Sequence, residues 1–314
     1  MITIIVPCYN ENIILGSFLQ QLEKITSNLH YDFELILIDN NSTDSTWNAM
    51  NEYESKFNKL KLIKFSNYFG KESAILAGLD HSSGKAVIIM DPDLEDPPHL
   101  IENLIDRWKE GYEVVYTIRT FEDIPFTKKI LKKIFYKILI FSSENQNKIP
   151  NNSGDYRIID RKIVDLIKKM RERTRFLRGL VNYVGFKQIG IPFERPFRKK
   201  GKSKSSYGFL INYSFDSLFS FSNVPINLII KFGFLLFIFI LFFAFFLLLQ
   251  KIFGKPIEGF TTVLLFIGLV SSFNILAIGL VGEYVSRIYN EVKERPNYII
   301  ENIVDKKINE SNYS

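Results

Sequence analysis

Four carboxylates lie within the six residues from Asp91 to Asp96, directly after the apolar run 86–90. That run is typical of a strand buried on both faces of a parallel sheet, and prolines within and after the acidic residues end it. Ligands of open α/β sheets bind at such strand ends. Because neighbouring carboxylates repel one another, the alternating Asp91, Asp93 and Glu95 are predicted to converge on one hard divalent cation, which would hold the phosphates of a nucleotide. The alternative is a solvated acidic turn.

Strands alternate with helices before and after this run, which predicts an α/β fold with a mostly parallel sheet and right-handed crossovers. Pro7 is expected to end the first strand. The expected strands are 3–6, 33–38, 60–65, 86–90 and 113–118, with helices to about 29, to about 57, and at 72–81 and 98–109. A further helix is expected at 161–170 and a strand at 185–193.

The carboxyl ends of these strands carry further polar side chains. Tyr9 and Glu11 follow the first strand, Asp39 the second and Arg119 the fifth. Taken singly, they could be a buried aromatic ring, a helix cap or a surface ion pair, but together they predict one ligand site along a single edge of the sheet. The chain has neither GxGxxG nor GxxxxGK[ST], which excludes a conventional dinucleotide or P-loop site.

Cysteine and histidine content narrows the function classes further. The single cysteine, Cys8, excludes a disulfide framework and a cysteine-based zinc site, and the three histidines are scattered. The sequence opens on an apolar strand without a preceding basic region, so we expect no signal peptide and a cytosolic N-terminal part.

Two long stretches without charged residues, 232–249 and 263–281, are each long enough to cross a bilayer as a helix. Basic residues flank the pair on both outer sides, and the intervening segment 250–262 carries few charges. The positive-inside rule therefore places both termini in the cytosol and that segment on the far side. The expected domains are a catalytic domain at 1–205, a juxtamembrane amphipathic segment at 206–225, a transmembrane hairpin at 226–285 and a cytosolic tail at 286–314, disordered from 306.

The net charge of +6 comes largely from regions expected near this membrane. Segment 124–141 suits either a helix on the membrane surface or an ordinary amphipathic core helix. Segment 195–204 has six basic residues and no acidic one, which is typical of a solvated loop unless a membrane is close. Beside the predicted spans, anionic lipid or a lipid phosphate is favoured over nucleic acid as the partner.

Several motifs together resemble the polyprenyl-phosphate glycosyltransferases of family two, which have the GT-A fold and include bactoprenol glucosyltransferases and dolichol-phosphate mannosyltransferases. The resemblance covers nearly the whole chain. It rests on PCYNE at 7–11, DNNSTD at 39–44, NYFGK at 67–71, DPDLEDPP at 91–98, GDYR at 154–157, RFLRGL at 175–180, RxxRxxGxSK at 195–204, GEY at 282–284 and RPNY at 295–298. Asn40 stands where the family often has a second Asp, and Glu95 where it often has Gln.

The resemblance implies inverting transfer of a sugar from a nucleotide sugar, most simply a UDP-sugar such as UDP-glucose, to a membrane polyprenyl phosphate such as undecaprenyl phosphate. Asp91, Asp93 and Glu95 would hold Mg²⁺ or Mn²⁺ on the diphosphate. Asp155 matches the family's candidate base, but it could instead orient the acceptor or the sugar, since a phosphate dianion is itself a nucleophile. The implied nucleotide-sugar residues are Pro7, Tyr9, Glu11, Asp39, Lys71 and Arg119. The implied acceptor-phosphate residues are Arg178, Arg198, Ser203 and Lys204.

Two alternatives remain beside this enzyme, which would be a multi-pass protein of the inner (cytoplasmic) membrane. A processive polysaccharide synthase would need more membrane spans and a QxxRW motif, and neither Trp47 nor Trp108 lies in one. A membrane-anchored nucleotide-sugar sensor without catalysis would be expected to have a damaged acidic triad. The sequence leaves the sugar and a homo-oligomer open.

Overall fold

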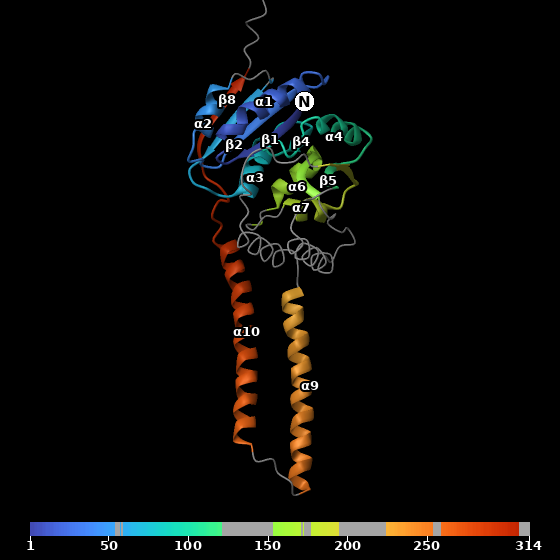
Figure 1. Ribbon diagram of the computed structural model, residues 1–314, viewed down its shortest axis with the longest axis vertical. Helices are drawn as coiled ribbons and strands as arrows, with labels where there is room; N and C mark the ends of the chain where they lie inside the picture. Colours follow the sequence, from blue (N-terminus) through green and yellow to red (C-terminus); the bar gives the residue numbers. More distant parts are fainter. Residues whose placement is uncertain are drawn as a thin grey trace, which may run out of the picture. The chain divides into compact units, whose positions relative to one another are not determined.

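The computed structural model describes residues 1–53, 57, 59–120, 153–170, 172, 177–194, 224–253 and 259–307 of the 314-residue chain. The chain forms two compact units, one made of Met1–Asn212 with Pro296–Ser314 and the other of Tyr213–Arg295. The first unit contains the β-sheet and the second contains two long helices (Figure 1).

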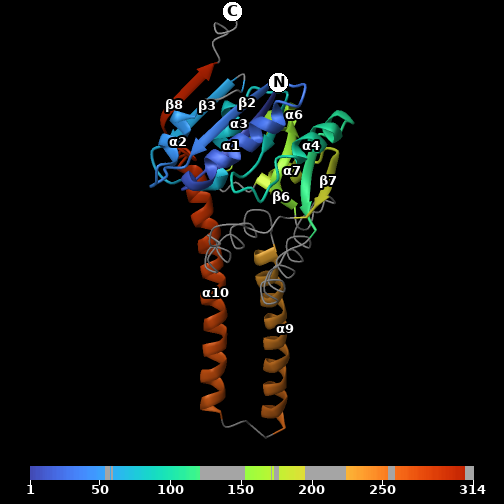
Figure 2. The ribbon, with the colours of Figure 1, turned by 45° about the horizontal axis from the view of Figure 1, so that its top comes forward.

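The described residues form one eight-stranded sheet, ordered β7-β5-β6-β4-β1-β2-β3-β8 (Figure 2). The four central strands β4, β1, β2 and β3 are parallel, as the alternation of strands and helices predicts. Strand β6 lies antiparallel between β4 and β5, β7 is parallel to β5, and β8 is antiparallel to β3 at the edge. The strands are β1 (Ile2–Cys8), β2 (Phe33–Asp39), β3 (Lys59–Phe65), β4 (Ala86–Ile89), β5 (Val114–Arg119), β6 (Ser153–Asp160), β7 (Gln188–Phe193) and β8 (Ile300–Lys307).

Helices cover both faces of the sheet because the central strands are apolar on both sides. On one face, α1 (Asn12–Thr26), α2 (Thr46–Glu52) and α4 (Leu100–Lys109) pack with Ile4 in the main hydrophobic core. On the other face are α3 (Lys71–His81), α6 (Arg161–Lys169) and α7 (Leu177–Val184). Helix α3 approaches β1 so closely that a Cβ on Gly78 would clash with the side chain of Ile5.

Three details differ from the sequence-based expectation. Pro7 does not end the first strand, because it lies within β1 in register with Ile38, and β1 continues to Cys8. Strand β6 was not predicted. The C-terminal segment forms β8, which includes Lys306 and Lys307 and adds to the sheet, so the predicted disorder from residue 306 is wrong for these two residues.

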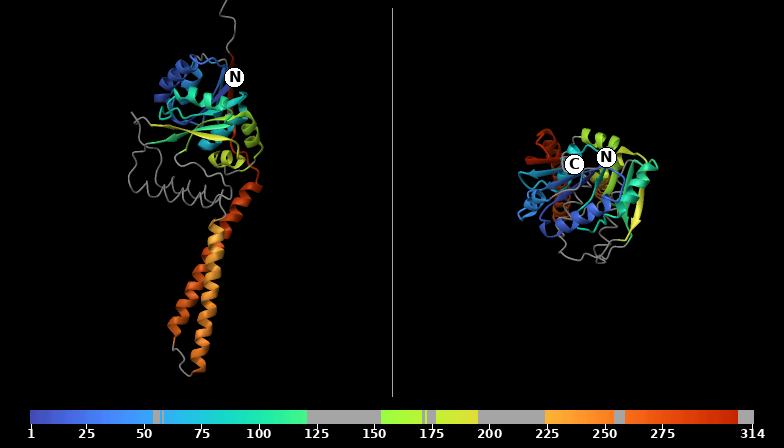
Figure 3. Two further views of the ribbon diagram at one scale, coloured as in Figure 1. Left: turned by 90° about the vertical axis from the view of Figure 1, so that its right-hand side faces the viewer. Right: turned by 90° about the horizontal axis from the view of Figure 1, so that it is seen from above.

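The second unit contains α9 (Val224–Ile252) and α10 (Phe260–Val292), which run side by side (Figure 3). The rings of Phe232 and Phe273 are 5.5 Å apart and those of Phe243 and Phe266 are 5.8 Å apart, so the helices are antiparallel. Among the described residues, one helical segment is long and apolar enough to cross a membrane, 266–292, and a shorter apolar segment lies at 229–243. A second span therefore stays a prediction.

Candidate active site

The polar residues predicted to share one edge of the sheet do lie at the carboxyl ends of the central strands. Asp39 is the last residue of β2, and the acidic loop follows β4. Three loops at this edge hold a non-glycine residue at positive φ, namely Asn10, Asn41 and Leu94. This conformation is costly for a residue as large as leucine, and such backbone strain clusters at functional sites.

The loop after β1 is joined to the loop after β2 by hydrogen bonds. The backbone N–H of Asn10 donates to Ser42 Oγ at 3.0 Å. The side-chain Oδ1 of Asn10 accepts from the backbone N–H of Thr43 at 2.8 Å. The Glu11 amide donates to Thr46 Oγ1 at 2.9 Å. These bonds hold the predicted nucleotide-sugar residue Glu11 beside the end of β2.

Asp39 is fully buried and keeps one carboxylate oxygen for a further partner. Its Oδ1 accepts from the Ser42 amide at 3.1 Å, whereas Oδ2 has no hydrogen-bond partner in the part of the chain that the structure describes. Burial raises the pKa of Asp39, although hydrogen bonds from Ser42 oppose the shift. A buried oxygen of this kind suits a hydroxyl or N–H group of a ligand.

Aromatic side chains border the same edge. Tyr9, which follows β1, lies with its ring centroid 4.7 Å from that of Tyr68, and Tyr68 is 52% exposed. The neighbouring Phe69 amide donates to Asn40 Oδ1 at 2.9 Å, which ties this loop to the end of β2. The residues at 67–70 thus extend the aromatic surface that Tyr9 begins.

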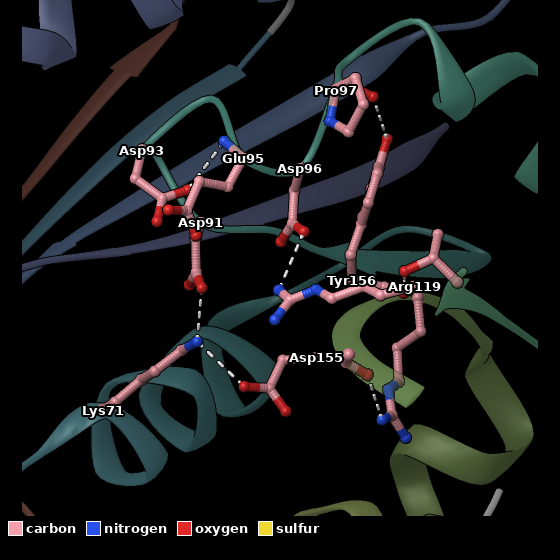
Figure 4. Close-up of polar contacts among 12 residues, drawn as sticks. Lys71, Asp91, Asp93, Glu95, Asp96, Pro97, Arg119, Asp155 and Tyr156 are labelled. Carbon is pink, nitrogen blue, oxygen red and sulfur yellow. Dashed lines mark hydrogen bonds and ion pairs between the residues drawn. The ribbon is translucent and has the colours of Figure 1, made fainter. Parts of the chain in front are cut away.

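Lys71 joins the acidic loop to β6. Gly70, at φ 87°, precedes it and lets the chain turn into α3 through a conformation that favours glycine. Lys71 Nζ lies 2.7 Å from Asp91 Oδ2 and 2.9 Å from Asp155 Oδ2 (Figure 4). The sheet register explains this bridge, since Ile89 pairs with Arg157 and the antiparallel strands bring Asp91 and Asp155 to the same edge.

Asp155 is held by a second cation. Arg178, near the start of α7, places its Nε 2.7 Å from Asp155 Oδ1. Burial alone would raise the pKa of Asp155, but Arg178 and Lys71 outweigh it and hold that pKa well below its usual range. Burial likewise would lower the pKa of Lys71, but the Asp155 and Asp91 carboxylates outweigh it and raise that pKa. Asp155 and Lys71 are therefore both charged at neutral pH.

Two further acids flank this cluster. Burial raises the pKa of Glu72 to about 7, and its Oε2 accepts from the Leu177 amide at 3.3 Å. Burial also raises the pKa of Asp96 to about 7, and the charge of Asp91 adds to the shift. Arg119, predicted to bind the nucleotide sugar, lies with its Nη2 3.4 Å from Asp96 Oδ1 (Figure 4).

The acidic loop does not bring its predicted triad together. Among the described residues, no three His, Cys, Asp or Glu side chains are placed to hold a metal ion. Asp91 is drawn toward α3 by Lys71, Asp93 Oδ1 accepts from the Glu95 amide at 3.0 Å, and Glu95 itself is buried. Asp91 and Asp93 still offer hard oxygen donors at one edge, and Mg²⁺ commonly binds one or two carboxylates plus substrate phosphates. That donor set fits a nucleotide-bound divalent cation, whereas Glu95 would have to leave its buried position to join it.

The structure thus brings most of the predicted site residues to one edge of the sheet. The predicted acceptor-side residues Arg198, Ser203 and Lys204, and the amphipathic segment 124–141, lie outside the described residues. Sequence reasoning missed Glu72, Tyr68 and the role of Asp96. Glu72 and Tyr68 adjoin the predicted Lys71, and Asp96 belongs to the acidic run, so their positions could have suggested all three.

Comparisons with known proteins show which proteins the chain resembles. Residues 3–167 match the family model described as Glycosyl transferase family 2. The uncharacterized glycosyltransferase sll0501 of Synechocystis is 36% identical over 304 residues, covering 96% of this chain and 95% of that protein. The SfII prophage-derived bactoprenol glucosyl transferase of Shigella flexneri is 33% identical over 303 residues, covering 95% of this chain and 97% of that protein.

Among solved structures, glucosyl-3-phosphoglycerate synthase from Mycobacterium tuberculosis, in complex with Mn²⁺, UDP-glucose and phosphoglyceric acid, resembles the chain with a TM-score of 0.48. The two sequences are 16% identical, and the match covers 70% of this chain and 79% of that one.

Proposed function

The chain belongs to glycosyl transferase family 2, and we propose that it transfers one sugar from a UDP-sugar, such as UDP-glucose, to a membrane polyprenyl phosphate such as undecaprenyl phosphate. It is a glycosyltransferase with an α/β, mostly parallel GT-A-like sheet. The name of the Shigella relative, a bactoprenol glucosyl transferase, and the apolar helix α10 support a lipid acceptor.

On the donor side, residues at the carboxyl ends of β1, β2 and β3 would contact the nucleoside. The Oδ2 of Asp39, which has no hydrogen-bond partner among the described residues, would accept a hydrogen bond from the nucleoside, and Tyr9 with Tyr68 would pack against the nucleoside. Glu11 and Pro7 would border the same position, and Arg119, which pairs with Asp96, would contact the nucleotide sugar from the end of β5. These residues bind and orient the donor without taking part in bond exchange.

Asp91 and Asp93 would hold Mg²⁺ or Mn²⁺, and Glu95 would become a third oxygen donor once it leaves its buried position. When bound, the ion neutralises charge on the diphosphate leaving group. Lys71 contributes a second positive charge beside Asp91, so the leaving diphosphate would meet a fixed cation of the protein itself.

On the acceptor side, Arg178 of α7 and Asp155 of β6 would lie beside the acceptor phosphate. A phosphate oxygen of the lipid attacks the anomeric carbon as the bond to the nucleoside diphosphate breaks, which inverts the configuration at that carbon. Asp155 is paired with two cations and has a depressed pKa, so it suits a group that orients the acceptor better than one that takes its proton. Arg178, with Arg198, Ser203 and Lys204, would bind the acceptor phosphate, because arginine binds phosphate through two parallel hydrogen bonds.

The observation that carries this proposal is the bridge of Lys71 between Asp91 and Asp155, which sets the donor-side loop against the acceptor-side strand within one ion-pair network. A processive synthase is disfavoured because neither tryptophan lies in a QxxRW motif, and a non-catalytic sensor is disfavoured because Asp91, Asp93 and Glu95 are all present. We further propose a location in the cytoplasmic membrane with the catalytic unit and both termini in the cytosol.

The test is sugar transfer into lipid by the purified full-length protein in detergent. A panel of radiolabelled nucleotide sugars is incubated with undecaprenyl phosphate and Mn²⁺ and extracted with organic solvent. We expect label in the lipid phase with one UDP-sugar, and loss of that label with EDTA or with Asp93→Asn, which removes a cation ligand. Transfer that persists in EDTA would contradict the metal assignment, and no lipid label with any donor would contradict the function.

A further inference from the structure

The RPNY motif at 295–298 follows α10 and has no role in the site described so far. In the structure residues 296–298 of this motif belong to the sheet-containing unit, where Tyr298 lies just before β8 begins. Its ring stacks on that of Phe65, with centroids 5.2 Å apart and planes 14° apart. Its hydroxyl donates to Asp80 Oδ2 at 2.7 Å.

These two contacts lie at the two ends of the segment that carries Lys71. Phe65 is the last residue of β3, immediately before the 66–70 loop, and Asp80 lies in the last turn of α3. The backbone adds a third tie, because the Ser66 amide donates to the Ile299 carbonyl at 3.0 Å. Tyr298 and Ile299 therefore contact both elements that position Lys71, the 66–70 loop and helix α3.

The contacts continue from Phe65 into the site. The ring of Phe69 meets Phe65 edge-on, with centroids 5.7 Å apart. The Phe69 amide is bonded to Asn40 at the end of β2, and Tyr68 packs on Tyr9. A shift of Phe65 would thus be transmitted through Phe69 to Tyr68 and Tyr9, and to the Lys71 ammonium.

We propose that Tyr298 is a positioning residue, through which the segment after α10 fixes the 66–70 loop and Lys71 in the arrangement that binds the nucleotide sugar. The inference rests on the proposed function in one respect, that this loop borders the donor. If this segment had a purely structural role, in which it and β8 only cover the edge of β3, replacing Tyr298 would have the same effect as replacing a stabilising residue of β8.

The test compares Tyr298→Leu, which loses both the flat ring and the hydroxyl, with Val304→Ala in the full-length protein. Val304, in β8, pairs with Leu62 of β3 and packs on the hydrophobic core, away from the 66–70 loop. Its truncation should therefore lower stability without changing the contacts of Phe65. Tyr298→Phe keeps the ring stack and loses only the bond to Asp80. Amide hydrogen exchange is measured for peptides spanning 66–71, at temperatures that give the Leu and Ala variants equal distance from their unfolding midpoints.

We expect Tyr298→Leu to speed exchange at 66–71 roughly tenfold while β1 and β2 keep their protection. Val304→Ala should leave the 66–71 peptide near wild type, and Tyr298→Phe should stay within about twofold because the stack remains. The KM for the UDP-sugar should rise about fivefold in Tyr298→Leu, because the arrangement of the 66–71 segment that binds the donor is then populated for a smaller fraction of the time.

Equal acceleration at 66–71 in Tyr298→Leu and Val304→Ala would overturn the proposal, as would unchanged exchange in Tyr298→Leu. Because hydrogen exchange needs no substrate, this result stands even if no nucleotide sugar is turned over. A complete lack of nucleotide-sugar turnover would contradict the proposed function, whereas the hydrogen-exchange result would still decide whether Tyr298 positions the 66–71 segment.

Discussion

At Lys71, one ammonium group pairs with two carboxylates, that of Asp91 in the loop after β4 and that of Asp155 in the neighbouring strand β6. Asp91 was predicted from its own sequence context, and Asp155 from a motif more than sixty residues later. Their meeting through Lys71 could not be predicted, because it depends on β6 entering the sheet antiparallel to β4. A network of this kind is vulnerable at its centre, since removing the Lys71 ammonium leaves two partly buried carboxylates close together, with Arg178 still paired to Asp155 alone.

We therefore expect Lys71→Met to reduce sugar transfer by about 100-fold or more, because it removes a cation from the predicted path of the leaving group. Transfer is measured by organic extraction after incubation with the UDP-sugar. Lys64→Met is the matched control, as Lys64 also pairs with a carboxylate, that of Glu301 in the outermost strand β8. Turnover of Lys71→Met close to that of Lys64→Met would rule out this role.

Glu72 predicts a pH dependence of stability. Its pKa is raised from 4.5 to about 7 in the folded protein, so between these values the folded state keeps a proton that the unfolded state releases. The contribution of Glu72 is thus fully present below pH 4.5 and is lost as the pH rises through 7. Glu72→Gln should flatten the dependence of the unfolding temperature on pH in this window.

Intrinsic tryptophan fluorescence suits this measurement, because the two tryptophans, Trp47 in α2 and Trp108 in α4, both lie in the sheet-containing unit. The thermal midpoint is followed from pH 4.5 to 7.5 in detergent for wild type and variant. Parallel curves for the two proteins would show that Glu72 does not titrate in this range.

At the scale of elements, strands with continuous apolar runs were predictable and the two added antiparallel strands were not. Strands β1 to β5 match the expectation because each of them contains apolar residues that are buried in the core. Strand β6 contains the GDYR motif and follows a polar segment, so it gives no such signal. Strand β8 carries Glu301, Asp305, Lys306 and Lys307, and charges of this kind are typical of edge strands as well as of tails.

The packing of α3 on β1 sets the height of Lys71 above the sheet, and Gly78 makes that close approach possible. Gly78→Ala should lower the free energy of unfolding by about 1–3 kcal/mol, because the added methyl group overlaps Ile5 and has no space to move into. Gly16→Ala in α1 is the control, since a Cβ there meets no atom within 4 Å and alanine favours a helix.

Denaturant unfolding followed by tryptophan fluorescence measures both changes. Gly16→Ala should be neutral or slightly stabilising. A Gly78→Ala protein as stable as Gly16→Ala would mean that α3 can move away from β1 without cost.

At the scale of the whole molecule, the chain combines a glycosyltransferase unit with two long helices, and the number of membrane spans decides which side of the membrane each part faces. One span, 266–292, is supported by the described residues, and the second, in α9, is predicted from sequence. With two spans, Asn302 in β8 faces the cytosol and Phe253, after α9, faces outward.

Cysteine labelling in intact cells tests this arrangement. In a Cys8→Ala background, Phe253→Cys should react with an impermeant thiol reagent, and Asn302→Cys should react only after the cells are opened. Both residues are exposed in the structure, so lack of reaction reports the membrane and not burial. Labelling of Asn302→Cys in intact cells would contradict a cytosolic catalytic unit.

The most direct measurement of the central claim is the mass of the lipid product. The purified protein is incubated with UDP-glucose, or with whichever UDP-sugar transfers, together with undecaprenyl phosphate and Mn²⁺, and the extracted lipids are analysed by mass spectrometry. The account predicts undecaprenyl phosphate carrying one sugar residue, released UDP in equal amount, and neither product from Lys71→Met. Lipids or free chains carrying several sugars, or consumption of the UDP-sugar without any glycosylated lipid, would contradict it.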